Sequence, residues 1–374
     1  MAIDTKSELR KRTQQSIKTE DIATTSTSPE QLKDHQHQHN HHQHHHEENM
    51  HAHELFQSMK AESKRLIFDP KNYPKEKVFC SQADKHKIPV YMYEKYVWGG
   101  YRMNLSFKEA FLSIFQINNE TVNNWTAILS ALVFFYFTID VIFFWEPTLI
   151  GETKNGYSSY FNHVVSENFL EKSMFVVYCV SSIITFGASL FYHWFSCMSE
   201  SAFHTLLRID ISSIALLIGG SYYPPLYYAF YCTQSVGVFY ISTITILCLS
   251  CVAMFIIPRF SREDYRQFRV RVFGFTALYG LCPLVHIIYL YGFDNDALNN
   301  RLLGIMYMYL CYAAGVFFYS TKLPERLWPG KFDIFCHSHQ FWHIFVFSAT
   351  LLHFYNCVYM KTESGVCFAP LPNT

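Results

Sequence analysis

Charged side chains are scarce over the last two-thirds of this 374-residue sequence. Residues 125–374 hold only 13 of the 30 basic and 14 of the 30 acidic side chains. Such depletion over a long stretch suits lipid better than water. The formal net charge is zero, so the sequence lacks the basic character typical of nucleic-acid-binding proteins. We therefore expect an integral membrane protein that binds membrane lipids and no nucleic acid.

Several other signals are missing. No apolar core separates a basic start from a small-residue cleavage site, so we expect no cleaved signal peptide. Most of the eleven cysteines fall in apolar segments, where cysteine behaves as a small hydrophobic residue. A DRY triplet after the third apolar block and an NPxxY motif in the seventh are also absent. These absences argue against a disulfide scaffold and against a G-protein-coupled receptor.

Two polar regions precede the apolar part. Residues 1–60 are rich in Thr, Ser and Gln, and their ten histidines between 35 and 53 could chelate metal weakly or form a low-complexity tract without a role. We expect this tail to be disordered and cytosolic, because it cannot bury enough apolar area to offset its ordering entropy.

Residues 61–124, here called the collar, mix aromatic residues, turn residues and charges before an amphipathic run. Apolar side chains recur near helical spacing in that run, which predicts a short helix lying on the membrane surface. Its apolar positions are Phe107, Phe111, Leu112, Ile114 and Phe115.

The remaining chain predicts an all-α bundle of seven transmembrane helices over residues 125–360, followed by a short tail at 361–374. The expected spans are about 125–145, 173–195, 210–230, 236–257, 271–291, 303–320 and 339–359.

The charges between these blocks predict an orientation. Residues 258–271 carry five arginines and 321–338 carry three more basic side chains, whereas 146–172 carries four glutamates and two lysines. The positive-inside rule then places the N-terminus in the cytosol and the C-terminus outside the cell or in a lumen. Three glycosylation sequons would lie on the cytosolic side and remain unused. They begin at Asn104, Asn119 and Asn124.

Ionisable groups inside membrane spans are costly and are default functional candidates. Ser189 and His193 end the second span, Asp210 opens the third, and His339 and His343 open the seventh, all at one predicted depth. Three imidazoles with one open position can form a catalytic zinc site, in which a bound water has its pKa lowered to about 7. Asp210 could hold this water as a general base, and Ser189 could orient a substrate carbonyl or a metal ligand.

Simpler interpretations stay open. The histidines could bond headgroups or carbonyls at the interface, and Asp210 could pair with Arg208 or an interfacial lysine. His337 lies outside the i, i+4 pair, so we expect it to face solvent and not to bind metal. Near the opposite membrane face, Asp140, His286 and His353 could pair with one another or meet a ligand, although polar contacts within the bundle are favoured.

Five motifs in order resemble the progestin and adipoQ receptor family, which includes the adiponectin receptors. They are "NNETVNNWTAILS", "SLFYH", "RID", "LPERLWPGKFD" and "SHQFWH", within a resemblance that covers roughly residues 88–360. Three further segments look most like the family's member three, the Raf-kinase-trapping Golgi branch. These are "IPVYMYEKYVWGGYR", "YYAFYC" and "MYMYL" with "FFYSTKLPER".

The resemblance implies a zinc ion held by His193, His339 and His343 near the cytosolic face. It also implies that Asp210 holds the zinc-bound water and that Ser189 is the serine of a Ser-x-x-x-His motif. It further implies distant kinship with alkaline ceramidases. Two functions follow. One is a receptor-like or scaffold regulator of signalling or membrane lipid balance, which retains a Raf-type kinase at Golgi membranes through the N-terminal region. The other is a zinc-dependent lipid amide hydrolase with a lipid in the bundle. Whether the protein is an enzyme stays open, as does a plasma-membrane location.

Overall fold

The computed structural model describes residues 88–89, 91–145, 157–231, 233–292 and 296–363. The chain divides into two compact units, Met1–Asn72 and Tyr73–Thr374, and every described residue belongs to the second. The predicted tail 1–60, most of the predicted C-terminal tail and the first part of the collar lie outside the described residues.

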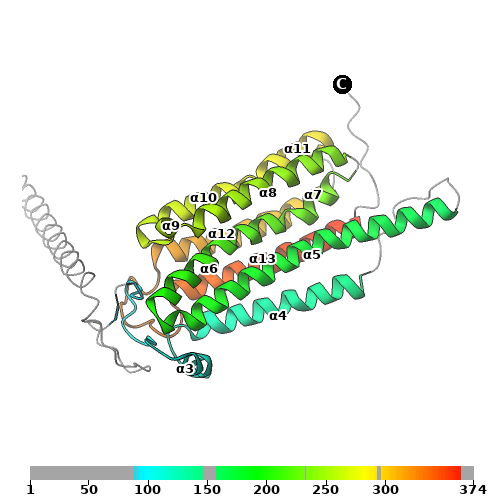
Figure 1. The fold of residues 1–374 in the computed structure, drawn as a ribbon. Coiled ribbons are helices and arrows are strands. Elements are labelled where there is room, and N and C mark those ends of the chain that lie inside the picture. Colours follow the sequence, from blue (N-terminus) through cyan, green and yellow to red (C-terminus); the bar gives the residue numbers. More distant parts are fainter. Residues whose placement is uncertain (1–87, 90, 146–156, 232, 293–295, 364–374) are drawn as a thin grey trace, which may run out of the picture. The chain divides into compact units, whose positions relative to one another are not determined.

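The described part of the chain is built from helices (Figure 1). In chain order they are α3 (Phe107–Leu112), α4 (Thr121–Phe143), α5 (Tyr157–Phe195), α6 (Glu200–Ser221), α7 (Tyr223–Ala229), α8 (Gln234–Ile256), α9 (Pro258–Ser261), α10 (Arg266–Leu278), α11 (Leu281–Tyr291), α12 (Asp296–Thr321) and α13 (Ser338–Glu363). Short 3₁₀ turns lie at Ser113–Phe115, Ser196–Met198 and Glu263–Tyr265.

Seven segments among these residues are long and apolar enough to cross a membrane, which confirms the predicted all-α bundle. They are Thr121–Phe143, Phe169–Met198, Glu200–Ala229, Gln234–Ile256, Glu263–Leu290, Leu302–Thr321 and Ser338–Lys361.

Two of the seven spans are broken helices. The third span passes from α6 to α7 just before Pro224 and Pro225, and the fifth passes from α10 to α11 around Gly280. Proline lacks a backbone N–H and clashes with the preceding turn, so it fits best in the first turn of a new helix, as in α7.

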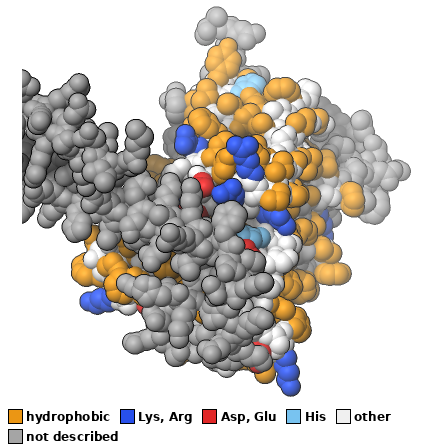
Figure 2. Space-filling model, turned by 60° about the vertical axis from the view of Figure 1, so that its left-hand side comes forward, with side chains coloured by type: hydrophobic (Ala, Val, Ile, Leu, Met, Phe, Trp, Pro, Cys, Tyr) orange, Lys and Arg blue, Asp and Glu red, His pale blue; other side chains and the backbone are white. Residues whose placement is uncertain are grey.

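Helix α13 packs against helices from both ends of the sequence. It contacts α12, α4 and α7, while α5 packs between α4 and α6, and α6 against α8 (Figure 1). Aromatic side chains fill the main core, where Phe137 stacks on Phe354 with ring centroids 4.1 Å apart. The outer faces carry large exposed apolar side chains such as Phe143 and Phe275, as expected for surfaces in contact with lipid (Figure 2).

The short helix predicted in the collar is present as α3. A capping box starts it, because the Ser106 hydroxyl accepts from the Glu109 backbone N–H while the Glu109 carboxylate accepts from the Ser106 N–H. Phe107, Phe111, Leu112 and Phe115 are exposed, as an interfacial helix requires. The prediction was wrong for Ile114, which lies in a tight 3₁₀ turn and points into the protein.

Arg102 joins the collar to the end of α5. Its guanidinium is almost fully buried and donates to the His193 carbonyl at 2.7 Å and to the Ser113 hydroxyl at 2.5 Å. Nearby, the Trp194 indole N–H donates to the Ala110 carbonyl at 3.0 Å. The collar segment after Ile88 is therefore packed into the end of the bundle.

Replacing Arg102 by methionine should destabilise this end of the protein. The change leaves the His193 carbonyl and the Ser113 hydroxyl without their buried partner, which costs about 1–3 kcal/mol per group. We expect a lower midpoint of thermal unfolding in detergent for Arg102→Met, whereas Lys108→Met, at an exposed position on α3, should leave it unchanged. Equal midpoints for both variants would show that this contact contributes little.

Candidate metal centre

Two helices bring three histidines together. His193 lies at the C-terminal end of α5, and His339 and His343 occupy the first turns of α13, one turn apart. The start of α13 is fixed by Glu325, a buried carboxylate that accepts from the Ser338 backbone N–H at 2.8 Å. A charged acceptor at a helix N-terminus is favourable because it satisfies an unpaired N–H and opposes the helix dipole.

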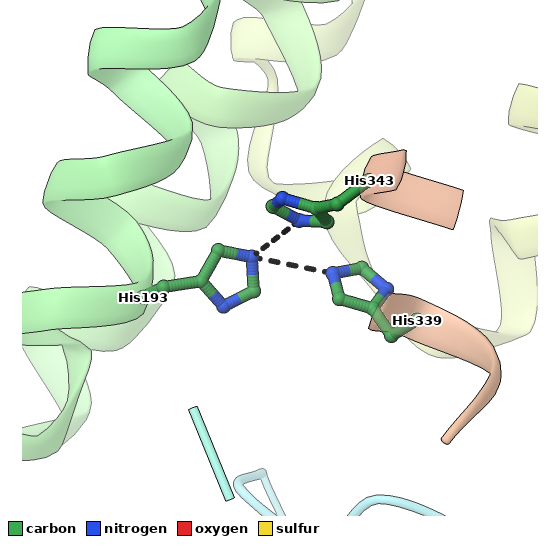
Figure 3. A group of neighbouring side chains, drawn as sticks. All are labelled: His193, His339 and His343. Carbon is green, nitrogen blue, oxygen red and sulfur yellow. Dashed lines mark hydrogen bonds between the residues drawn. The ribbon is translucent and has the colours of Figure 1, made fainter. Parts of the chain in front are cut away.

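The ring nitrogens converge on one point (Figure 3). The Nε2 atom of His193 lies 3.2 Å from Nε2 of His339 and 3.2 Å from Nε2 of His343. Two ligands at the usual zinc–nitrogen distance on a tetrahedral ion lie roughly 3.3–3.4 Å apart. The three histidines therefore fit a metal ion, and their ligand atoms all lie within 4.8 Å of one another.

The opposite ring nitrogens indicate which tautomers are present. Nδ1 of His193 lies 2.8 Å from the Glu120 carboxylate, and Nδ1 of His343 lies 3.3 Å from the Thr126 hydroxyl. A carboxylate accepts from Nδ1–H, which leaves the lone pair of His193 Nε2 facing the centre. This arrangement prepares the ring as a ligand.

Sequence reasoning missed Glu120. It lies directly before α4 and receives a second hydrogen bond, at 2.6 Å, from the Asn123 amide. Burial raises the pKa of Glu120, but the hydrogen bonds that its carboxylate accepts from His193 and Asn123 oppose this effect, and the pKa is lowered from its ordinary value. A carboxylate just ahead of an apolar span was the available signal, yet only the fold shows that it meets α5.

Asp210 and Ser189 also lie at this end of the bundle. Ser189 is buried one turn before His193, and it lies close to the half-buried Asp210 carboxylate of α6. Arg208, which the sequence offered as a partner for Asp210, donates to the Thr205 hydroxyl. The structure brings the three histidines together, with Ser189 one turn before His193 on α5. The roles of Asp210 and Ser189 stay predictions.

The prediction for His337 was wrong in its placement. Its side chain is only 5% exposed, and its Nε2 lies 3.1 Å from the Asn119 carbonyl. The loop that carries it folds back on the collar, where the Gly330 N–H donates to the Tyr96 carbonyl and Asp333 accepts from the Trp98 N–H. The group of converging ring nitrogens among the described residues is His193, His339 and His343.

Asp140, His286 and His353 were predicted to lie together near the opposite membrane face. The two histidines of this set hydrogen-bond other groups within the bundle. His353 Nε2 lies 2.8 Å from the Ser221 carbonyl, and His286 Nδ1 lies 3.1 Å from the Tyr240 hydroxyl. Asp140 is half-buried on α4. The favoured interpretation, polar contacts within the bundle, is confirmed for the two histidines.

Comparison with known proteins identifies the family. Residues 115–354 match the family described as Haemolysin-III related. The chain is 32% identical over 250 residues to the adiponectin receptor protein of Drosophila melanogaster, covering 67% of this chain and 52% of the relative. It is 31% identical over 269 residues to heptahelical transmembrane protein 1 of Arabidopsis thaliana, covering 72% and 77%. Progestin and adipoQ receptor-like protein 1 of Caenorhabditis elegans is 31% identical over 250 residues, covering 67% and 54%.

The names of these relatives agree with the family resemblance noted in the sequence, and the chain spans about half the length of the fly and nematode proteins. The Arabidopsis relative is named as heptahelical, in agreement with the seven candidate spans of the described residues. The match over residues 115–354 places the histidine cluster within the family's common region. This chain belongs to the Haemolysin-III related family of heptahelical, adiponectin receptor-like membrane proteins.

Proposed function

We propose that this protein is a zinc-binding, receptor-like or scaffold regulator of signalling or of membrane lipid balance. The observation that carries the proposal is the convergence of three Nε2 atoms from α5 and α13. A metal ion at this point ties two helices that are far apart in the sequence, with the collar's Glu120 behind one ligand. Such a centre stiffens the end of the bundle without any turnover.

Zinc is the proposed ion because of the donor set. Neutral imidazoles suit zinc, copper, iron and nickel, and the nitrogen spacing here fits tetrahedral coordination. A carboxylate that orients a metal-binding histidine is typical of zinc sites in proteins. His193, His339 and His343 would hold the ion.

The proposed partner is a Raf-type kinase or another signalling protein that docks on the N-terminal region. Support comes from the likeness of three segments to the Raf-trapping branch of the progestin and adipoQ receptors. That likeness also favours a Golgi membrane over the plasma membrane. The fly relative is named as a receptor for adiponectin, which supports a receptor-like role here.

The second candidate is a zinc-dependent lipid amide hydrolase. It is favoured by the contact between Ser189 and Asp210 beside His193. Zinc with an open position would supply a water of lowered pKa. Asp210 would take a proton from the attacking water and return it to the leaving amine as the C–N bond breaks. Ser189 would hold the Asp210 carboxylate in place and orient the substrate carbonyl.

Metal content tests the site directly. Purified wild-type protein should contain one zinc per chain by elemental mass spectrometry, and His343→Ala should lose most of it because one of three ligands is gone. His204→Ala is the matched control, since His204 is a half-exposed histidine at the start of α6 and outside the cluster. Zinc retained by His343→Ala would overturn the proposed ligand set.

The orienting role of Glu120 gives a second prediction. Glu120→Gln removes the charge that fixes the His193 tautomer, so zinc affinity should fall about 10–100-fold in a competition titration with a chelator. Glu200→Gln, which changes an exposed glutamate of α6, should leave the affinity unchanged. Wild-type affinity in Glu120→Gln would mean that the ring is oriented by packing alone.

Ceramide hydrolysis separates the two functions. A regulator with a structural ion should show no hydrolysis of ceramide by purified, zinc-loaded wild type. Hydrolysis that disappears in Asp210→Asn while zinc is retained would replace the regulator proposal with the hydrolase. Product release followed by mass spectrometry, with zinc measured on the same samples, gives both readouts.

A further inference from the structure

The outward face of α10 combines apolar side chains with one cation. Phe268, Arg271, Phe275 and Leu278 follow one another at helical spacing and are all exposed, with Phe275 77% exposed. Arg269 and Thr276, on the other side of the helix, are buried. The exposed stripe therefore faces the lipid that surrounds the bundle.

Arg271 differs from the other four arginines of residues 258–271. Each of those four bonds a group that lies outside α10: Arg259 to the Tyr265 hydroxyl, Arg262 to Asp264, Arg266 to Glu263, and Arg269 to the Phe260 and Arg262 carbonyls. The Arg271 guanidinium contacts only the Gln267 carbonyl of its own helix, at 3.3 Å. Among the described residues, no carboxylate pairs with it.

Arg271 lies near one end of the fifth span, where its charge can meet lipid headgroups. It lies eight residues inside the span that begins at Glu263, about 12 Å along a helix. That span of 28 residues is longer than the hydrocarbon core requires, so Arg271 lies near the boundary between acyl chains and headgroups. A cation there needs a counterion, and its long side chain can reach toward the interface.

We propose that Arg271 and the exposed face of α10 bind an anionic phospholipid. The guanidinium is planar and donates to phosphate oxygens in pairs, and four of its five N–H groups are not used within the helix. Phe275 and Leu278, one and two turns deeper, offer an apolar surface to an acyl chain. The five arginines of residues 258–271 against two acidic residues favour a lipid with net negative charge.

This site is independent of the metal centre and of the proposed function. It lies on the outside of the fifth span, whereas the histidines lie between the second and the seventh. Basic side chains at this end of the molecule are visible among hydrophobic ones in Figure 2. The lipid would fix the depth of α10 in the membrane.

The test uses the full-length chain, stripped of lipid in detergent. Phosphatidylserine, phosphatidylcholine and inorganic phosphate are added separately, and the thermal midpoint and the number of lipids retained in native mass spectrometry are measured. Wild type should gain stability with phosphatidylserine only. Arg271→Gln should bind it about fivefold more weakly, as expected for one cation near an anionic surface. Arg271→Lys should recover part of the affinity.

Arg326→Gln is the matched control, because Arg326 is an exposed arginine in the loop between α12 and α13. It should keep the wild-type response. An equal response in Arg271→Gln would overturn the proposal. Stabilisation by phosphatidylcholine would show that negative lipid charge is not required, and stabilisation by inorganic phosphate would show a soluble-anion site; either result would refute an anionic-lipid site. Lipid counts remain decisive if a variant changes the midpoint by itself.

Discussion

The meeting of imidazole rings from α5 and α13 is the constraint around which this end of the bundle is arranged. The Nε2 atoms of His339 and His343 each lie 3.2 Å from Nε2 of His193, a spacing that suits a metal ion between the three rings. The surroundings hold that arrangement: Glu120 fixes one ring, Thr126 contacts another, and Glu325 fixes the start of α13. Side chains from the collar, from the spans and from the loop before α13 thus all help to position the three imidazole rings.

Away from the histidine cluster, the bundle has the features expected of helices in a lipid bilayer. Its outer faces are apolar, its core is aromatic, and hydroxyl side chains within the spans mostly bond their own helix, as Thr138 and Ser182 do. Polar groups that reach another helix are buried or half-buried, as the Tyr178 hydroxyl is where it donates to the Thr350 carbonyl.

Local sequence was enough to predict the spans and the ligand candidates. Hydropathy sets the spans, and the shared depth of His193, His339 and His343 requires only the alternating direction of successive helices. The roles of Glu120 and Arg102 were not predicted because their partners lie far away in the chain, and neither spacing nor charge pattern reveals such a contact. His337 was misplaced because its position outside the i, i+4 histidine pair was taken to mean exposure to solvent, whereas the loop that carries it is hydrogen-bonded to the collar.

His193 is held by the collar from two directions. Arg102 binds its backbone carbonyl, and Glu120 binds its ring. The seven spans alone, cut free of what precedes them, would retain every metal ligand and yet lose both supports of one ligand. The boundary drawn by hydropathy and the boundary of the metal-binding unit are therefore different, and a minimal unit for biochemical work begins ahead of Arg102.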